Sequence, residues 1–454
     1  MKKQALVIFG ATGNLMFKKL IPALYHLLLI DKSRDIKIYA IGRTAYNTEE
    51  YIEAAKPQMT SKVDWDILIP HLEYVQMGLD TDEDYLYLKS RIKDEYKDVM
   101  YYLAVPPYLF PVIAKGVCNA KLVSKGDNSK RIVFEKPFGE DLMSAKQINR
   151  NLWEYFDESQ IYRIDHYLGK DMIQNILVVR FGNKIFENTW NHNMIRSVVI
   201  IAKETEGVMS RGNYYDTIGA LKDMIQSHLL QMASIVAMSK PQSFSSEDIK
   251  DKKVNVFHSF KIDPQSIVKG QYLGYTDTEK VSKDSITETF VYCKATIDND
   301  KWKDVPFYFI TGKKLDEKRS EIIINFKDDD SLLALNKDAL PRQNKLIIKV
   351  SPEDGVEFRF NVKTPGLQNS ITTAALDYCH SCLSLQNTPE AYEKLLLDLM
   401  DQNRTLFTRW DEIESTWEIV NDAIKKHEAP YVYKDYADLA HHIAQTQGVD
   451  INDL

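Results

Sequence analysis

The chain has 454 residues, of which 44% are hydrophobic and 27% are charged. That balance is ordinary for a globular protein with a large core, and the length favours two or three domains. The formal net charge of −7 argues against a broad nucleic-acid-binding face, which needs an excess of basic side chains. No stretch approaches the roughly 20 consecutive apolar residues of a membrane span. We therefore expect no nucleic-acid partner and no membrane partner.

The N-terminus is similar to a signal peptide only at its first three residues, Met1-Lys2-Lys3. The apolar run that follows, Ala5–Phe9, ends at Gly10 and is too short for the hydrophobic region of a signal peptide. We therefore expect a cytoplasmic protein.

The first part of the chain alternates short apolar runs with helical patterns. Because the runs are apolar throughout, they predict a parallel sheet that is covered by helices on both faces. The first helical pattern, Leu20–Leu28, contains Pro22, where we expect the helix to kink or restart. The predicted strands are Ala5–Phe9, Ile36–Ile41, Met100–Val105 and Arg131–Phe134.

From about Ser197 the apolar residues alternate with polar ones, which predicts a mainly antiparallel sheet with one wetter face. Helical patterns cover Tyr214–Met238 and Ala374–Phe407. We predict an α/β Rossmann-like domain over residues 1–164 and an α+β domain over residues 165–454, with a large mainly antiparallel sheet. The predicted strands of the second domain are Ser197–Lys203, Thr287–Ile297, Val305–Thr311, Glu321–Phe326, Lys345–Val350 and Val356–Val362.

Cys379 and Cys382 form a single C-x-x-C pattern. A zinc site would need a second pair of ligands at similar spacing, and none follows in the sequence. We expect ordinary reduced cysteines, as in a reducing compartment, and no metal centre. A redox or adventitious metal-binding role for the pair is the alternative.

A glycine loop lies directly between the first predicted strand and the first helix. Glycine lets the backbone turn tightly and approach a pyrophosphate, whose charge the helix N-terminus then stabilises. This placement predicts a dinucleotide site formed by Gly10, Ala11, Thr12, Gly13, Asn14 and Leu15.

The second predicted strand is followed by Arg43, with no carboxylate before Glu49. An NAD site usually places an acidic side chain here for the ribose, whereas an arginine suits the 2′-phosphate of NADP. We predict NADP as the cofactor, with NAD as a weaker alternative.

Three further segments carry chemistry. Lys136 follows the fourth strand, where strand ends face the ligand crevice, and its bond to Pro137 could be cis. If the next segment enters a helix, His166 and Lys170 share one face and form a phosphate grip. Asp165 then points elsewhere and is free to orient another group.

The third segment contains Asp223 and His228, which are five residues apart. On an α-helix that spacing separates two side chains by about 140°, so we expect them to flank a ligand rather than stack. Taken alone, a histidine on an apolar helix face is more often structural than catalytic.

Together these segments resemble the glucose-6-phosphate dehydrogenase family, in the family's order. The likeness covers nearly the whole chain, and the segment Arg163–Lys170 is its most specific part. The matching segments are Gly10–Leu15, Glu135–Gly139, Arg163–Lys170, Arg211–Asp216 with the trailing Gln226–His228, Gly270–Gly274, Pro306–Lys313 and Ala391–Asp398.

The resemblance implies an NADP-dependent enzyme that oxidises glucose 6-phosphate at C1, the first step of the oxidative pentose phosphate pathway. It implies that His228 is the general base and Asp165 its partner carboxylate. The residues implied around the sugar phosphate are His166, Tyr167 and Lys170; those implied at the sugar or the cofactor are Lys136, Glu204 and Asp223; and Lys313 and Lys318 are implied basic residues from the second domain.

The chain departs from the family pattern at three positions: Asn14 replaces the usual aspartate, Phe17 replaces a cofactor-side lysine, and Ser227 replaces the usual asparagine before the base. We expect a homo-oligomer, either a dimer or a tetramer. The alternatives are another NADP-dependent sugar oxidoreductase, whose unphosphorylated substrate would leave the phosphate grip unfilled, and an NADP-binding regulator, which would not need the acid–base pair.

Overall fold

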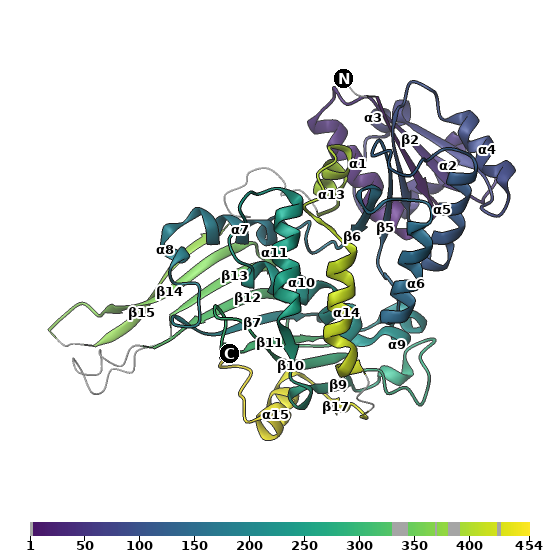
Figure 1. Cartoon of the computed structure of the whole chain (residues 1–454). Helices are drawn as coiled ribbons and strands as arrows, with labels where there is room; N and C mark the ends of the chain where they lie inside the picture. Colours follow the sequence, from purple (N-terminus) through teal and green to yellow (C-terminus); the bar gives the residue numbers. More distant parts are fainter. Residues whose placement is uncertain (1–2, 329–343, 368–369, 380–390, 425–427) are drawn as a thin grey trace. The chain divides into compact units, whose positions relative to one another are not determined.

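A computed structural model describes residues 3–328, 344–367, 370–379, 391–424 and 428–454 (Figure 1). The chain divides into two compact units. The first unit consists of Met1–Gly169, Phe244–Lys250 and Pro389–Glu414, and the second of Lys170–Ser243, Asp251–Thr388 and Ser415–Leu454. Two helices, α11 (Ser246–His258) and α14 (Trp410–Ile424), contain residues of both units.

The first unit has a seven-stranded sheet in the order β16-β6-β5-β4-β1-β2-β3. Neighbouring strands are parallel except for β16, which pairs antiparallel with β6. The predicted parallel sheet is confirmed. Its strands are β1 (Gln4–Phe9), β2 (Ile36–Gly42), β3 (Leu72–Gln76), β4 (Asp98–Leu103), β5 (Lys130–Glu135), β6 (Ile161–Ile164) and β16 (Phe407–Thr408).

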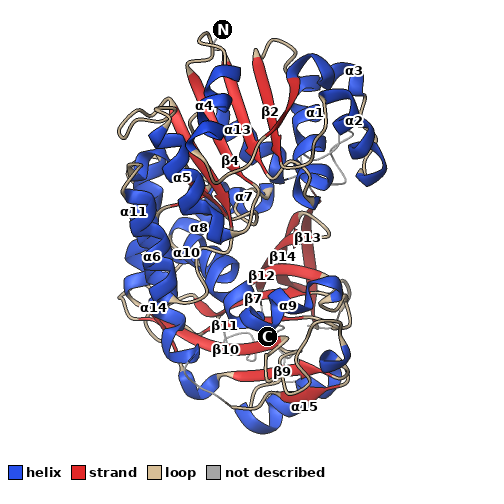
Figure 2. Ribbon diagram, turned by 90° about the vertical axis from the view of Figure 1, so that its right-hand side faces the viewer, coloured by secondary structure: helices blue, strands red, loops and turns tan. Residues whose placement is uncertain are grey.

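Helices cover this sheet (Figure 2). Alternate residues of β1, such as Val7 and Phe9, pack in one apolar cluster with residues of α4, α5 and α6. Pro22 lies in the first turn of α1, so the expected restart of the helix is confirmed. The helices are the π-helix η1 (Met16–Leu20), α1 (Ile21–Ile30), α2 (Thr48–Ala55), α3 (Trp65–Leu68), α4 (Asp82–Arg91), α5 (Phe110–Asn119), α6 (Leu142–Trp153) and α13 (Ala391–Met400), with 3₁₀ turns at Lys56–Gln58, Ile69–His71, Pro107–Leu109 and Glu158–Gln160.

The second unit has a ten-stranded sheet in the order β15-β14-β13-β12-β7-β11-β10-β9-β17, with β8 also paired to β10. It is mainly antiparallel, as predicted; the β7–β11 and β9–β17 pairs are parallel. The strands are β7 (Ile195–Lys203), β8 (Phe260–Ile262), β9 (Val268–Tyr272), β10 (Phe290–Ile297), β11 (Phe307–Gly312), β12 (Arg319–Phe326), β13 (Lys345–Ser351), β14 (Gly355–Lys363), β15 (Ile371–Cys379) and β17 (Tyr431–Tyr433).

Helices pack on this sheet too. Tyr215 of α9 and Leu439 of α15 join the apolar cluster on one face, together with Val199 and Ile201 of β7. The other helices include α7, which contacts β13. The helices are α7 (Asp171–Gly182), α8 (Lys184–Glu187), α9 (Gly212–Ala220), the π-helix η7 (Leu221–Leu229), α10 (Leu230–Ala237) and α15 (Tyr436–Gln447), with 3₁₀ turns at Met209–Arg211, Pro264–Ser266 and Tyr275–Asp277.

Two helix predictions need correction. The pattern over Tyr214–Met238 is not one continuous helix, because Gly219 has a left-handed φ of 71° and separates α9 from η7. The helix predicted over Ala374–Phe407 is wrong at its start, where β15 extends to Cys379. Only α13 is helical among the described residues of that range, and 380–390 lie outside them.

The expectation of reduced thiols is wrong at Cys379, which is disulfide-bonded, whereas Cys118 and Cys293 are free. Cys382 lies outside the described residues. Among the described helices, none combines the length and the apolar composition that crossing a membrane requires.

Candidate active site

The glycine loop is held in a tight turn against the end of β2. The Gly10 and Ala11 amides both donate to the Ile41 carbonyl oxygen, at 3.1 and 2.9 Å. Gly10 has a φ of +89°, and a Cβ at this position would lie 2.3 Å from the Ala104 carbonyl oxygen. Only glycine fits here, and the helix that starts at Asn14 follows the turn at once.

Arg43 comes directly after β2 and is exposed. Because Gly10 and Ala11 bond to Ile41, the loop and Arg43 lie at the same end of the sheet. The structure therefore brings together the residues predicted for the cofactor. Phe17 stands where the resemblance implies a cofactor-side lysine. Its side chain is only 7% exposed and packs beside the Tyr51 ring, so this position belongs to the core.

Lys136 follows β5, and its bond to Pro137 is cis, as the sequence suggested. The preceding residue, Glu135, accepts a hydrogen bond from the Tyr102 hydroxyl at 2.5 Å. Burial raises the pKa of Glu135 to about 7, while hydrogen bonds from Tyr102 and Tyr392 oppose the rise. This carboxyl group is therefore half-protonated near neutral pH.

Asp165 follows β6 and is only 2% exposed. Its Oδ1 accepts a hydrogen bond from the Tyr167 amide at 3.0 Å, which fixes the direction of the carboxylate. The rings of His166 and Tyr167 meet edge to face, with centroids 5.1 Å apart. The segment does not enter a helix, which was the condition for His166 and Lys170 to share a face: residues 166–169 form a turn, and α7 begins only at Asp171. The shared helix face of His166 and Lys170 therefore does not exist.

Lys170, the residue that precedes α7, belongs to a charged group in the second unit. Burial lowers the pKa of Lys170; the Asp354 carboxylate opposes this effect, and the Lys318 ammonium adds to it. Lys170 and Lys318 thus lie within electrostatic reach of each other. A partly buried ammonium with a second, exposed ammonium near it favours an anionic ligand, because such a ligand stabilises the charge that burial disfavours.

Glu204 and Lys313 form an ion pair next to β11. Lys313 is only 5% exposed, and its ammonium lies 5.2 Å from the ring centroid of Tyr215. Burial raises the pKa of Tyr215 well above its ordinary value, and the carboxylates of Asp223 and Glu204 contribute. The structure therefore gathers three predicted residues, Glu204, Lys313 and Asp223, around one buried tyrosine.

Asp223 and His228 lie on η7, where the sequence analysis assumed an α-helix. A π-helix bonds residue i to residue i+5 rather than i+4, as the Leu230 amide does to the Ile225 carbonyl. Because a π turn contains more residues than an α turn, residues five apart lie closer to one side than they would on an α-helix. The expectation that Asp223 and His228 lie about 140° apart is therefore wrong for this helix. His228 is 1% exposed.

Comparisons with known proteins show the family to which the chain belongs. Residues 7–175 match the family model described as glucose-6-phosphate dehydrogenase, NAD binding domain. Residues 177–447 match the model described as glucose-6-phosphate dehydrogenase, C-terminal domain. The chain belongs to the glucose-6-phosphate dehydrogenase family. The domain that residues 7–175 form accordingly binds a nicotinamide dinucleotide.

Individual members of the glucose-6-phosphate dehydrogenase family are similar along almost the whole chain. A glucose-6-phosphate 1-dehydrogenase from Borreliella burgdorferi is 40% identical, over 93% of this chain and 91% of the relative. One from Bacillus subtilis is 37% identical, over 92% and 90%. A solved glucose-6-phosphate dehydrogenase in complex with its substrate glucose-6-phosphate has a TM-score of 0.90 at 32% identity and covers 98% of both chains.

The sequence did not predict a role for two residues near the candidate site, Glu135 and Tyr215. Glu135 stands beside the predicted Lys136, yet only the structure reveals the burial that shifts its pKa. Tyr215 is the second tyrosine of Asn213–Asp216, and nothing in that pattern indicates that it lies among Glu204, Asp223 and Lys313.

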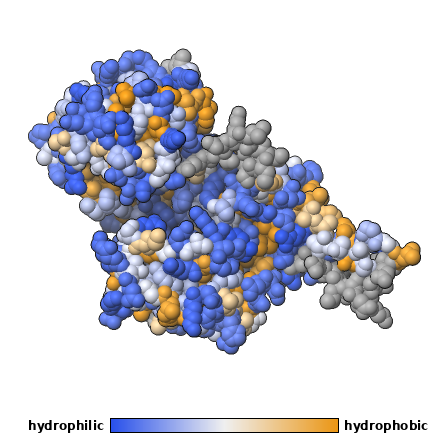
Figure 3. All heavy atoms as spheres, turned by 180° about the vertical axis from the view of Figure 1, so that it is seen from behind, coloured by the Kyte–Doolittle hydropathy of each residue, from blue (hydrophilic) through white to orange (hydrophobic). Residues whose placement is uncertain are grey.

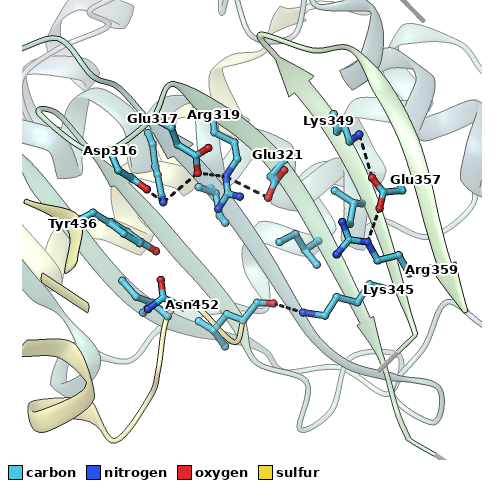
Figure 4. A pocket seen from close by; sticks show the side chains of 16 residues that line it. Asp316, Glu317, Arg319, Glu321, Lys345, Lys349, Glu357, Arg359, Tyr436 and Asn452 are labelled. Carbon is cyan, nitrogen blue, oxygen red and sulfur yellow. Dashed lines mark hydrogen bonds and ion pairs between the residues drawn. The ribbon is translucent and has the colours of Figure 1, made fainter. Parts of the chain in front are cut away.

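A separate cavity of about 510 Å³ opens on the sheet of the second unit, and Figure 4 shows its lining. Its charges pair within the wall: Lys349 with Glu357 at 3.1 Å, and Arg319 with Glu317 at 3.1 Å. None of the sequence-predicted site residues lines this cavity.

The pKa of Glu135 predicts a pH-dependent stability. The folded value of about 7 exceeds the unfolded value of roughly 4.3, so folding takes up a proton and stability falls as pH rises between the two. The Glu135→Gln variant has no titrating group at this position, so it does not lose folding stability in this way as pH rises. The unfolding free energy of the variant relative to the wild type should rise by about 2 to 3 kcal/mol from roughly pH 5 to pH 8 in urea titrations. A difference that stays constant with pH would contradict the assignment.

Proposed function

We propose that this protein is an NADP-dependent glucose-6-phosphate 1-dehydrogenase. It oxidises D-glucose 6-phosphate at C1 to 6-phospho-D-glucono-1,5-lactone and so begins the oxidative pentose phosphate pathway. One observation carries the proposal: the segment Arg163–Lys170, the most specific part of the resemblance, runs from the end of β6 into a turn at residues 166–169, where the Tyr167 amide bonds to the Asp165 carboxylate. A similar solved enzyme is described in complex with glucose 6-phosphate.

The reaction removes a proton and a hydride from the substrate, and His228 takes the proton. The ordinary pKa of an imidazole is about 6.5, which suits a base that works around neutral pH. We assign Asp165 as the carboxylate that holds the imidazole in the required tautomer and stabilises the imidazolium once it forms. The fixed direction of its Oδ1, set by the Tyr167 amide, supports this role.

We assign the sugar phosphate to His166, Tyr167 and Lys170, with Lys318 beside Lys170. The lowered pKa of Lys170 supports this assignment, because a phosphate dianion compensates an ammonium that burial disfavours. Binding energy from the phosphate, remote from C1, then holds the reacting carbon in place.

We assign the sugar hydroxyls to Glu204, Asp223 and Lys313, and the boundary between sugar and cofactor to Lys136. The support is the ion pair between Glu204 and Lys313 and the buried setting of Lys313. An ion pair holds both side chains in one geometry. Fixed side chains can then orient a neutral sugar through several hydrogen bonds.

The residues that would hold NADP are those of the glycine loop, Gly10–Leu15, together with Arg43. Gly10 allows the tight turn, because a Cβ there would collide with the Ala104 carbonyl oxygen, and the turn leads directly into a helix N-terminus, which favours the charge of a pyrophosphate. When bound, the nicotinamide supplies the acceptor for the hydride from C1. The exposed Arg43 guanidinium offers a planar fork for the 2′-phosphate.

We further propose that the enzyme is a homo-oligomer, a dimer or tetramer, that works in the cytoplasm, where sugar phosphates and NADP are found. Support for self-association comes from the edge strand β15, on which Leu376 is 64% and Tyr378 42% exposed. Figure 3 shows apolar residues over the end of β14 and β15. Large apolar side chains that one chain leaves exposed at a sheet edge are typical of a surface that another protein chain covers.

The experiment that tests this function is a spectrophotometric assay of reduced nicotinamide, with glucose 6-phosphate, glucose and each cofactor in turn. The proposal expects turnover with glucose 6-phosphate and NADP. Equal efficiency with unphosphorylated glucose would instead identify another sugar oxidoreductase, and binding of NADP without turnover would identify a regulator.

Replacing His228→Ala should preserve substrate binding and remove most turnover. Loss of a general base typically lowers kcat by roughly 10² to 10⁴-fold. Steady-state kinetics, with His258→Ala as the control for an exposed histidine, measure the effect. A kcat close to that of the wild type would refute the assignment of the base.

Replacing Lys170→Ala should chiefly weaken binding of the sugar phosphate. A charge-assisted hydrogen bond is worth about 1.5 to 3 kcal/mol, which corresponds to roughly ten- to a hundred-fold in KM. The exposed Lys184→Ala variant on α8 is the matched control. If KM for glucose 6-phosphate is unchanged while kcat falls, Lys170 does not bind the phosphate.

Replacing Arg43→Ala should raise the KM for NADP and leave the KM for NAD almost unchanged, because only NADP carries the 2′-phosphate. The wild type should favour NADP in kcat/KM, and NAD serves as the internal control. Equal losses with both cofactors would mean that Arg43 supports the loop instead of recognising the phosphate.

A further inference from the structure

Three consecutive residues before β10, Thr287–Thr289, connect separate parts of the second unit. The Thr287 hydroxyl donates to the Asp216 carbonyl oxygen on α9, at 2.6 Å. The Thr289 carbonyl oxygen accepts a hydrogen bond from the Lys313 amide, at 3.0 Å. Between them, Glu288 faces the start of η7. This short segment therefore links the helix of Asp223 and His228 to the pair of Glu204 and Lys313.

Glu288 bonds twice to the first turn of η7. Its carboxylate Oε1 accepts a hydrogen bond from the Leu221 amide at 3.1 Å, and its carbonyl oxygen accepts one from the Ala220 amide at 3.0 Å. The amides at the start of a helix have no partner within the helix, so an acceptor from outside stabilises that end. A carboxylate also interacts favourably with the positive end of the helix dipole.

The turn at Gly219 makes room for this contact. Gly219 has a φ of +71°, and a Cβ there would lie only 2.6 Å from Glu288 Oε1. The left-handed residue interrupts helical hydrogen bonding between α9 and η7, so that Ala220 and Leu221 need acceptors from elsewhere. Glu288 supplies both acceptors.

We propose that Glu288 is a positioning residue for the reaction: its two hydrogen bonds fix where η7 begins and thereby place Asp223 and His228 relative to Lys313 and Glu204. The inference rests on the proposed function, since it takes His228 as the base. Glu288 itself touches neither the sugar nor the cofactor in this account. Glu288 acts through the first turn of η7: by fixing where the helix begins, it fixes the positions of the residues that follow.

The test compares Glu288→Ala, which removes the acceptor, with Glu288→Gln, which keeps a carbonyl acceptor at the same distance. Asp216→Asn is the matched control, because Asp216 anchors the same segment through Tyr275 and Ser285 but lies before the Gly219 turn. Kinetics are measured well below the melting temperature of each variant. Circular dichroism confirms that each is folded.

Glu288→Ala should lower kcat by roughly 10- to 100-fold with a KM for glucose 6-phosphate within about three-fold, because small misplacements of reacting groups cost rate. Glu288→Gln should stay within about three-fold of the wild type in kcat. Asp216→Asn should lower the melting temperature and leave kcat within about the same range. A wild-type kcat in Glu288→Ala, or an equal loss in Asp216→Asn, would overturn the proposal. If Glu288→Ala does not fold, Glu288→Asp, whose carboxylate is one methylene short, takes its place with the same expected direction.

Amide hydrogen exchange separates this inference from the proposed function. In Glu288→Ala, exchange over residues 220–229 should accelerate relative to the wild type and to Glu288→Gln, whether or not the enzyme turns over glucose 6-phosphate. Unchanged exchange there would overturn the role of Glu288. An inactive wild type with accelerated exchange in the variant would refute the proposed function alone.

Discussion

The i→i+5 hydrogen bonding of η7 is the constraint on which the candidate site of the second unit depends. On an α-helix, Asp223 and His228 would lie about 140° apart, whereas the wider π turn brings them closer to one side. π-helical turns are rare, and they occur frequently at functional sites. Such a helix needs support from its surroundings.

That support comes from side chains along the helix. Glu288 bonds the first turn, and Gln226 donates to the Thr416 hydroxyl on α14 at 3.0 Å. The Ser227 hydroxyl donates back to the Asp223 carbonyl oxygen at 2.7 Å. Serine bonds of this kind bend helices, so the residue that departs from the family pattern also favours the unusual winding.

Charge is arranged differently around the candidate residues of the two units. In the second unit, Lys170 lies near Lys318, and the buried Lys313 is neutralised by Glu204. The first group favours an anion, and the second is already balanced, which suits a neutral sugar ring that carries a phosphate at one end. In the first unit, burial keeps Glu135 half-protonated near neutral pH, so Lys136 follows a carboxyl group of reduced charge.

The sequence predicted the architecture because both sheets have clear hydrophobic patterns. It missed short strands such as β3 and β6, whose four or five residues carry little periodicity. It also assumed ordinary helices at the two segments that matter most. The turn after Asp165 is closed by the bond from the Tyr167 amide to the Asp165 side chain, whereas the start of the π-helix after Gly219 is bonded by Glu288, which lies far away in the chain. Local patterns carry no information about such contacts.

The identities of the candidate site residues were accessible from motifs, but their electrostatic states were not. Tyr215 and Glu135 owe their shifted pKa values to burial, which depends on the packing of the complete unit. Phe17 illustrates the same limit: the sequence marks it as a departure from the family, and only the packing against Tyr51 explains how the chain accommodates it.

The most direct test of the central claim uses D-glucose 6-phosphate labelled with deuterium at C1. The label is traced by mass spectrometry of the reduced cofactor and of the sugar product. The account predicts that one deuterium moves from C1 to the nicotinamide ring, and that unlabelled substrate in heavy water gives an unlabelled cofactor. Deuterium retained in the sugar product, or released to water, would contradict hydride transfer from C1.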